Sequence, residues 1–352
     1  MDSRCRKIVR EVLSLPTAPF HEQAVMDYVQ SFCKRLGVPV KKDRYGNLMA
    51  LYRRGRAQPV AISAHMDHPG CEVVAVQGKK ITVQILGGLD PKQFAKSRLI
   101  LVSKGQSVRA KVLRQTGAKG SKKFMAVAQR PVARGSFGYF DLPACQFKNG
   151  LIYTKAADNV MGVSVLLNLL DAFVRKKARA NIACLFTRAE EVGFIGALGV
   201  MEKQFLPRKY PLVVLETSSA KAGKVKIGGG PALRVGDRWS TFSPEMDVWF
   251  RHAAPKTFQR ALLPGGRCEA SVYIHAGYRA GCLALPLGNY HNKGPKGFAA
   301  EYVSESDYEG LLKWLKNLAT GRPVEKILDR NETLLRKRFL KSRKRLLRHL
   351  SS

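Results

Sequence analysis

Residues 59–64 read PVAISA and run directly into His65, Met66 and Asp67. An apolar run of this kind, without polar alternation, is typical of a strand that is buried on both faces. Further apolar runs alternate with segments of helical periodicity: strands at 48–52, 181–187, 212–215, 248–250 and 283–286, and helices at 3–13, 21–36, 160–173, 196–204 and 305–318. This alternation predicts an α/β fold with a mixed, largely parallel sheet flanked by helices.

Residues 70–153 have a different pattern. Short β-like runs are separated by Gly and Lys turns, and no long helical pattern appears: 73–76, 81–86, 99–103, 108–113 and 124–128. This pattern predicts a small all-β domain inserted into the α/β domain. We therefore expect an α/β domain at 1–69 and 154–324, an inserted β domain at 70–153, and a basic amphipathic tail at 325–352.

The composition excludes two classes of protein. Of the 352 residues, 45% are hydrophobic and 25% charged, which excludes a wholly disordered chain. The apolar runs, such as 211–215, are far shorter than the ~20 residues of a membrane span. The first residues, MDSRCRKIVREVLS, lack the apolar core of a signal peptide, so we expect a cytoplasmic location. The seven cysteines form no CxxC pair and are expected to be reduced structural thiols.

The chain is strongly basic, since 61 Lys and Arg against 26 Asp and Glu give a net charge of +35. Such an excess is typical of proteins that meet a polyanion, an acidic membrane or an acidic substrate. Residues 70–155 hold 16 basic and 3 acidic side chains, and residues 325–352 hold 10 and 3. Because the excess is spread along the chain, a bias of the host's proteins is favoured over a dedicated anion-binding surface.

The tail combines this charge with an apolar stripe formed by Leu335, Phe339, Leu346 and Leu350. A basic amphipathic helix of this kind can lie on an acidic membrane, bind nucleic acid or pack on its own protein. We favour the last, a solvated helix that caps the α/β domain or a partner subunit.

Polar residues follow the predicted central strands and open one of the helices. They are His65 and Asp67, Glu190 and Glu191, Glu216, Tyr290 and His291, and, before the helix, Asp158. In open α/β sheets the carboxyl ends of the strands meet at one edge, where ligands bind. Two His and several carboxylates there predict a site for Zn²⁺ or a similar divalent ion.

Six stretches carry a resemblance to a known family, and they cover nearly the whole chain: DRYGNLMA (43–50), HMDHPG (65–70), KAADNVMG (155–162), TRAEEVGFIGA (187–197), VVLETS (213–218) and LGNYHN (287–292). In this order they resemble the dinuclear zinc aminopeptidases of the glutamyl and tetrahedral aminopeptidase family. Some of its members are also called endoglucanase M, and its clan includes zinc exopeptidases and deacylases. The resemblance implies the zinc-exopeptidase fold with an inserted β domain.

The resemblance also implies the ligands of two divalent ions, most readily Zn²⁺, with Co²⁺ or Mn²⁺ as alternatives. His65 and Glu216 would hold the first ion and Glu191 and His291 the second, while Asp158 would bridge both.

Two further roles are implied by the family. Asp67 would fix the tautomer of the His65 ring. Glu190 would act as the general base that takes a proton from a metal-activated water and passes it to the leaving amine.

The chain departs from the family where substrate is expected. Glu216 replaces a frequent Asp but keeps the charge. The segments around Arg267 and around Tyr290 and Lys293 differ from the usual family sequences, so we take these three as candidate substrate-binding residues. The family also implies peptide substrates and a homo-oligomer. The net charge of +13 on 70–155, from 16 basic and 3 acidic residues, favours a dimer over a large shell.

Two other functions stay open on the sequence. A deacylase of N-acyl amino acids would use the same metal chemistry, and no sequence feature separates it from an aminopeptidase. A polyanion-binding protein that retains the fold is the second, with nucleic acid or an acidic membrane as its partner. It is less favoured, because such a protein would be free to lose Glu190 or a metal ligand, and this chain has all of them.

Overall fold

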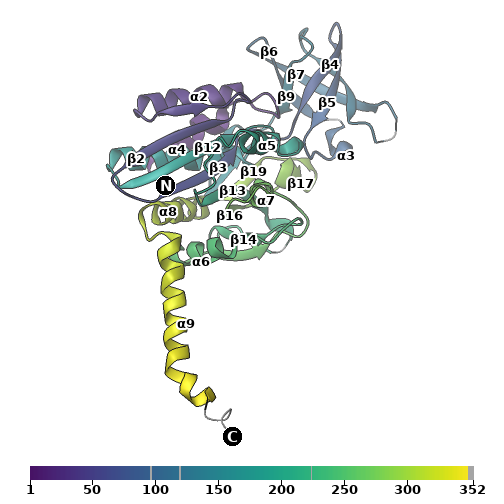
Figure 1. The fold of residues 1–352 in the computed structure, drawn as a ribbon. Coiled ribbons are helices and arrows are strands. Elements are labelled where there is room, and N and C mark those ends of the chain that lie inside the picture. Colours follow the sequence, from purple (N-terminus) through teal and green to yellow (C-terminus); the bar gives the residue numbers. More distant parts are fainter. Residues whose placement is uncertain (96, 119, 223, 348–352) are drawn as a thin grey trace.

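The computed structural model describes residues 1–352 except 96, 119, 223 and 348–352. An eight-stranded mixed sheet forms the centre of the larger domain (Figure 1). In spatial order its strands are β1 (Val40–Lys42), β2 (Leu48–Arg54), β12 (Ala180–Thr187), β3 (Pro59–His65), β13 (Leu212–Ser219), β16 (Ala280–Leu287), β14 (Ala232–Gly236) and β15 (Gln259–Leu262). Strands β12, β3, β13 and β16 run parallel to their neighbours in this group. The predicted fold class is confirmed.

Helices cover both faces of the sheet. Alternate side chains of the strands enter two separate hydrophobic cores, as the period of two in a strand requires. One core lies under α1 (Ser3–Ser14), α2 (Gln23–Arg35), α4 (Val160–Arg175) and α8 (Glu305–Thr320). The other lies under α5 (Ile195–Glu202) and α7 (Glu269–His275). The central strands are therefore buried on both faces, which explains their unbroken apolar sequences.

One predicted strand is wrong. Residues 248–250 lie in the helix α6 (Pro244–Ala253), not in a strand. Pro244 occupies the start of this helix, where its missing N–H costs nothing, and Met246, Trp249 and Phe250 are buried at helical spacing. Three apolar residues in a row are too few to separate the two periodicities.

A second unit is a closed six-stranded barrel, drawn at the upper right of Figure 1. Its strands are β4 (Gly70–Gln77), β5 (Lys80–Leu86), β6 (Arg98–Ser103), β7 (Gln106–Thr116), β8 (Lys123–Ala128) and β9 (Phe137–Phe140). Phe94 of the short helix α3 (Pro91–Phe94) packs edge-on against Phe124 and Phe140 in the barrel core. A small inserted β domain thus follows the first predicted metal ligand in the chain.

The last part of the predicted insertion pairs elsewhere. Strands β10 (Cys145–Lys148) and β11 (Leu151–Thr154) form a sheet with β19 (Glu301–Ser304), which precedes α8. The remaining short elements are β17 (Lys293–Gly294), β18 (Gly297–Phe298), and the 3₁₀ turns η1 (Glu190–Val192), η2 (Ala220–Ala222) and η3 (Tyr290–Asn292). The boundaries at 70 and 153 stay a prediction.

The helix α9 (Val324–Leu347) extends away from the α/β domain (Figure 1). Val324 and Ile327 are buried in its first turn, whereas every side chain described from Asn331 to Leu346 is exposed. The helix therefore packs on its own domain only at its start. Leu350, predicted to continue the apolar stripe, lies outside the described residues. Among the helices of the described chain, none is both long and apolar enough to cross a membrane.

Candidate metal centre

Six side chains from distant parts of the sequence meet at the carboxyl ends of the central strands. We call them the ligand cluster: His65, Asp158, Glu190, Glu191, Glu216 and His291. They come from the end of β3, the loop before α4, the turn η1 after β12, strand β13, and the turn η3 after β16. The structure thus brings together every residue predicted as a metal ligand, with the predicted general base beside them.

Ligand atoms of the cluster fall into overlapping groups of three, each with its atoms within 4.8 Å of one another. The groups are His65, Asp158 and Glu216; Asp158, Glu191 and His291; and His65, Glu190 and Glu191. The first two groups share only Asp158. The Oδ1 atom of Asp158 lies 3.5 Å from Nε2 of His65, and its Oδ2 atom lies 3.7 Å from Nε2 of His291. The two oxygens of one carboxylate therefore face two different imidazoles.

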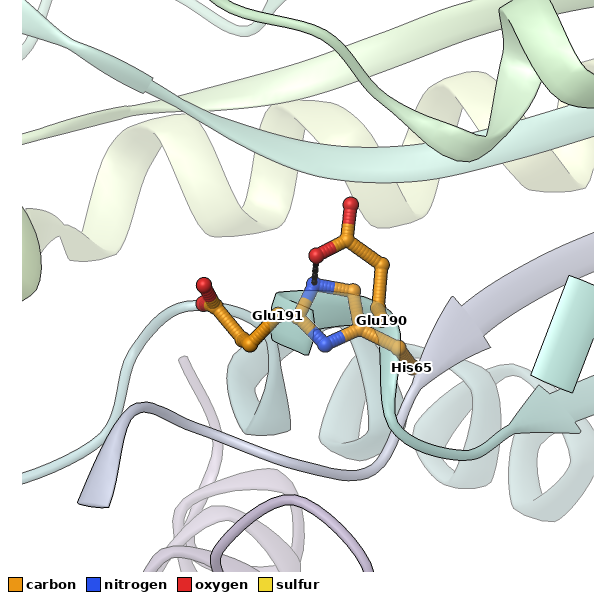
Figure 2. Close-up of side chains that lie close together, drawn as sticks. All are labelled: His65, Glu190 and Glu191. Carbon is orange, nitrogen blue, oxygen red and sulfur yellow. Dashed lines mark ion pairs between the residues drawn. The ribbon is translucent and has the colours of Figure 1, made fainter. Parts of the chain in front are cut away.

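Glu190 and Glu191 are neighbours whose side chains extend in different directions (Figure 2). Glu190 Oε2 lies 4.0 Å from Nε2 of His65, whereas Glu191 Oε1 lies 3.4 Å from Nε2 of His291. Adjacent carboxylates can therefore serve different partners at this site.

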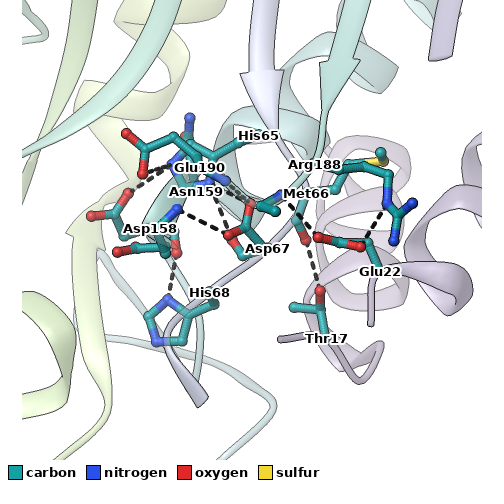
Figure 3. Close-up of polar contacts among 12 residues, drawn as sticks. Thr17, Glu22, His65, Met66, Asp67, His68, Asp158, Asn159, Arg188 and Glu190 are labelled. Carbon is teal, nitrogen blue, oxygen red and sulfur yellow. Dashed lines mark hydrogen bonds and ion pairs between the residues drawn. The ribbon is translucent and has the colours of Figure 1, made fainter. Parts of the chain in front are cut away.

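Asp67 connects the first strand end to the turn that carries these two glutamates. Its Oδ1 lies 3.3 Å from Nδ1 of His65. Its carboxylate also accepts hydrogen bonds from the backbone N–H groups of Glu190, at 3.0 Å, and Glu191, at 3.1 Å (Figure 3). The buried carboxylate of Asp67 thus orients both the His65 ring and the turn η1.

A second contact holds the same turn from the other side. Glu22, which is fully buried before α2, accepts a hydrogen bond from Arg188 Nε at 2.7 Å and another from the N–H of Ala189 at 2.9 Å (Figure 3). No sequence pattern indicates this role of Glu22, because Arg188 and Ala189 lie more than 160 residues away.

The loop of Asp158 is held through its backbone. Glu301, on β19, accepts hydrogen bonds from the N–H groups of Ala157, at 2.7 Å, and Asp158, at 3.0 Å. The Nδ1 atom of His68 bonds the carbonyl oxygen of Asp158, and its Nε2 lies 2.9 Å from Oδ1 of Asn292. These contacts leave the Asp158 carboxylate free to face the cluster. The motif HMDHPG contained His68 but gave no sign of this role.

His291 is oriented by the segment of the barrel unit between β5 and α3. Its Nδ1 lies 3.0 Å from the carbonyl oxygen of Gly88, so Nδ1 carries the proton and Nε2 faces the cluster. A side chain at position 88 would place its Cβ 2.9 Å from Cε1 of His291, so only glycine fits this approach. The orientation of His291 therefore depends on both the α/β domain and the barrel unit.

Burial and neighbouring charges raise the pKa values of three members of the cluster. Burial and the charge of Asp158 raise the pKa of Glu216 to about 8. Burial, with Glu216 and Glu191 nearby, raises the pKa of Glu190 well above its ordinary value. Burial alone would lower the pKa of His291, but the Glu191 and Asp158 carboxylates raise it to about 10. Without a cation, protons must neutralise part of the cluster.

Two buried atoms in the cluster lack a hydrogen-bond partner among the described residues. They are Oδ1 of Asp158 and Nε2 of His291, each of which faces other ligand atoms. A buried polar atom without a partner is costly, and coordination of a cation removes that cost. Carboxylate oxygens with imidazole nitrogens are a donor set suited to Zn²⁺. The residues therefore fit divalent ions.

A cavity of about 690 Å³ opens beside the cluster. One part of its wall is apolar: Phe194, Val225, Leu262 and Leu263. Three cationic side chains also line the cavity: Lys224, Arg234 and Arg267. Arg234 is buried and donates a hydrogen bond from Nε to Ser218 Oγ at 2.8 Å, and Arg267 stacks 4.5 Å over the ring of Trp239. The sequence offers one hint of this residue, because Arg234 is the single charged residue in the otherwise apolar stretch 232–235.

The three predicted substrate residues are placed differently. Arg267 and Tyr290 line this cavity, and the Tyr290 ring stacks on His291 with centroids 3.9 Å apart. Lys293 is not among the lining residues, and its Nζ lies 2.9 Å from Oδ2 of Asp90. Only Arg267 and Tyr290 are positioned to meet a ligand in the cavity.

A model of the family described as M42 glutamyl aminopeptidase matches residues 119–310, more than half of the chain. The chain belongs to the M42 glutamyl aminopeptidase family. The family predicted from the six sequence motifs is thereby confirmed, and membership identifies this M42 protein as a hydrolase of the peptidase class.

Individual relatives of this M42 chain are distant in sequence and close in fold. A protein of Acetivibrio thermocellus named "Putative aminopeptidase" is 24% identical over 314 residues, which cover 84% of this chain and 92% of that protein. The TET aminopeptidase of a marine sediment thaumarchaeon superposes with a TM-score of 0.80 at 16% identity, over 93% and 99% of the two chains. The Pyrococcus horikoshii TET1 peptidase gives 0.75 at 19%, over 90% and 99%.

Proposed function

We propose that this M42 protein is a metal-dependent aminopeptidase that removes N-terminal residues from peptides. The observation that carries the proposal is the pair of ligand groups that share only the carboxylate of Asp158. His65, Glu216 and Asp158 would hold one ion, and Glu191, His291 and Asp158 would hold the other. Zn²⁺ is the expected metal, with Co²⁺ and Mn²⁺ as alternatives.

The chemistry divides between the metal and the protein. When bound, divalent ions would supply a water molecule of lowered pKa and polarise a carbonyl oxygen. Glu190 would accept a proton from the attacking water while the oxygen of the water bonds to the scissile carbonyl carbon. Glu190 then delivers the proton to the leaving nitrogen as the C–N bond breaks, so the proton count balances. Asp67 keeps Glu190 in place through the backbone hydrogen bond at 3.0 Å.

The charge of the cavity bears on the substrate. Two divalent ions, at +4, would balance the four carboxylates of the cluster, at −4. Lys224, Arg234 and Arg267 would then leave the cavity with a charge of +3. We infer that peptides with an acidic N-terminal side chain react faster than those with an apolar one.

The decisive experiment measures hydrolysis by purified protein of aminoacyl-amides, dipeptides and N-acyl amino acids. Chelation should abolish the hydrolysis of unblocked substrates, and Zn²⁺, Co²⁺ or Mn²⁺ should restore it. Among unblocked substrates, kcat/KM should be higher for a Glu-amide than for a Leu-amide, and the difference should shrink as salt rises. Full activity after exhaustive chelation contradicts the proposal. Hydrolysis of N-acyl amino acids alone would make the protein a deacylase.

We further propose that the protein forms a homo-oligomer of two or more copies. The similar TET1 peptidase of Pyrococcus horikoshii, which can assemble into a tetrahedron or a large octahedral shell, supports this proposal. Size-exclusion chromatography with light scattering would give the mass of the assembly. A monomer at every concentration would contradict the proposed oligomer.

A further inference from the structure

The part of α9 that projects from the α/β domain, residues 334–346, has an unusual charge. It contains the exposed cations Arg336, Lys337, Arg338, Lys341, Arg343 and Arg345. The acidic residues of the helix, Glu325, Asp329 and Glu332, all precede this part. None of those six cations forms an ion pair within the described chain. The projecting part of α9 is therefore a free basic surface.

The same segment exposes large apolar side chains. Leu335 is 66% exposed, Phe339 57% and Leu346 65%. Spacings of four and seven residues bring these three to one side of the helix. In an ideal helix Arg336 and Arg343 flank this stripe on one side, and Arg338 and Arg345 on the other. The apolar stripe and the cations that flank it can therefore contact one flat surface at the same time.

Charge and apolarity together select among partners. A second copy of α9 would bring the two sets of cations against each other, and the rest of each chain adds to a net charge of +35. Nucleic acid would neutralise the cations but leave the apolar stripe in water. A surface of anionic lipid takes both, because headgroups meet the Arg and Lys side chains while Leu and Phe enter the acyl boundary.

We propose that the projecting part of α9 docks the enzyme on an anionic lipid surface and lies along it. This docking does not rest on the peptidase activity, because α9 is remote from the ligand cluster. It requires no membrane-spanning segment.

The test is co-sedimentation of the full-length protein with vesicles of phosphatidylcholine alone or mixed with phosphatidylserine. We expect binding to the mixed vesicles only. Leu335→Ser with Phe339→Ser and Leu346→Ser keeps every charge and should weaken binding at least about tenfold. Arg336→Gln with Arg343→Gln should weaken it by a similar factor, since each cation near the surface is worth about fivefold.

A matched control removes two exposed cations of the barrel strand β7, through Lys111→Gln with Arg114→Gln. It should leave vesicle binding within about twofold. Unchanged thermal melting and peptidase rate would show that each α9 variant is folded, because its substitutions are exposed.

Three outcomes overturn the proposal. The first is equal binding to both kinds of vesicle. The second is a serine variant that binds mixed vesicles and a single-stranded RNA as the parent does, which would identify a polyanion site. The third is a serine variant that changes the oligomer mass but not vesicle binding, which would identify a second copy as the occupant.

Discussion

In the ligand cluster, four carboxylates and two imidazoles are largely buried within a few ångströms of one another. In contrast, six described cations of α9 are exposed to water: Arg336, Lys337, Arg338, Lys341, Arg343 and Arg345. Because the cluster is buried, its charges must be neutralised. The pKa values reflect this: that of Glu216 is raised to about 8 and that of His291 to about 10. Water solvates the charges of α9 at little cost. A charge change in the cluster should therefore alter chemistry, and one in α9 should alter only association.

The largest effect is expected for Asp158→Ala. This variant removes the one carboxylate common to both ligand groups, so both metals and all measurable peptidase activity should be lost. Metal analysis and activity assays check this. The control Asp141→Ala removes a carboxylate of the barrel that pairs with Arg109 at 3.3 Å, and it should keep both. An Asp158→Ala protein with two tightly bound ions would contradict the bridging role.

A smaller loss is expected for Glu301→Gln, which replaces the charged acceptor of the Ala157 and Asp158 N–H groups by a neutral, weaker one and touches no ligand atom. Outer contacts of this kind typically change metal affinity by about 10–100-fold. Titration of the metal-free variant with Zn²⁺ measures it. Glu305→Gln, at the start of α8 where Glu305 pairs with Arg6 at 2.7 Å, is the matched control. Equal affinities of the two variants would remove Glu301 from the account.

Metal binding should release protons at pH 7. Glu216 and His291 have pKa values above 7 in the metal-free cluster, so both hold protons that a metal must displace. Affinity should therefore rise as the pH increases from 6 to 8. Calorimetry in buffers of different ionisation enthalpy should report a net release of protons on metal binding. Heats that do not depend on the buffer would show that the cluster is deprotonated beforehand.

The smallest effect is expected for Leu335→Ala in α9. This side chain is 66% exposed, so the free energy of unfolding should change by no more than about 0.5 kcal/mol. By contrast, Ile327→Ala, in the buried first turn of the same helix, should lower it by about 2 kcal/mol or more. Chemical denaturation of both variants checks the pair. A large loss for Leu335→Ala would mean that the projecting part packs on protein.

The sequence predicted where the cluster would assemble, because strand ends in a parallel sheet share one edge. It did not predict what holds each ligand. The tautomer of His291 depends on the carbonyl of Gly88, and the Asp158 loop depends on Glu301. Such contacts join residues more than 100 positions apart and leave no local pattern.

Two further differences have other origins. The apolar triplet at 248–250 fitted a strand until helical burial of Trp249 decided otherwise. Lys293 lies two residues after the predicted metal ligand His291, yet its ammonium group pairs with Asp90. Adjacency along the chain does not fix the direction of a side chain in an irregular turn.

The measurement closest to the central claim is the metal content of Glu190→Gln together with its turnover. Glu190 also belongs to a possible ligand group with His65 and Glu191, so its role as base or as ligand must be separated. If Glu190 is the general base, the variant keeps both metal ions and kcat falls by about 10²–10⁴-fold, because an amide cannot accept the proton. A Glu190→Gln protein stripped of metal, or one with unchanged turnover, would contradict the account.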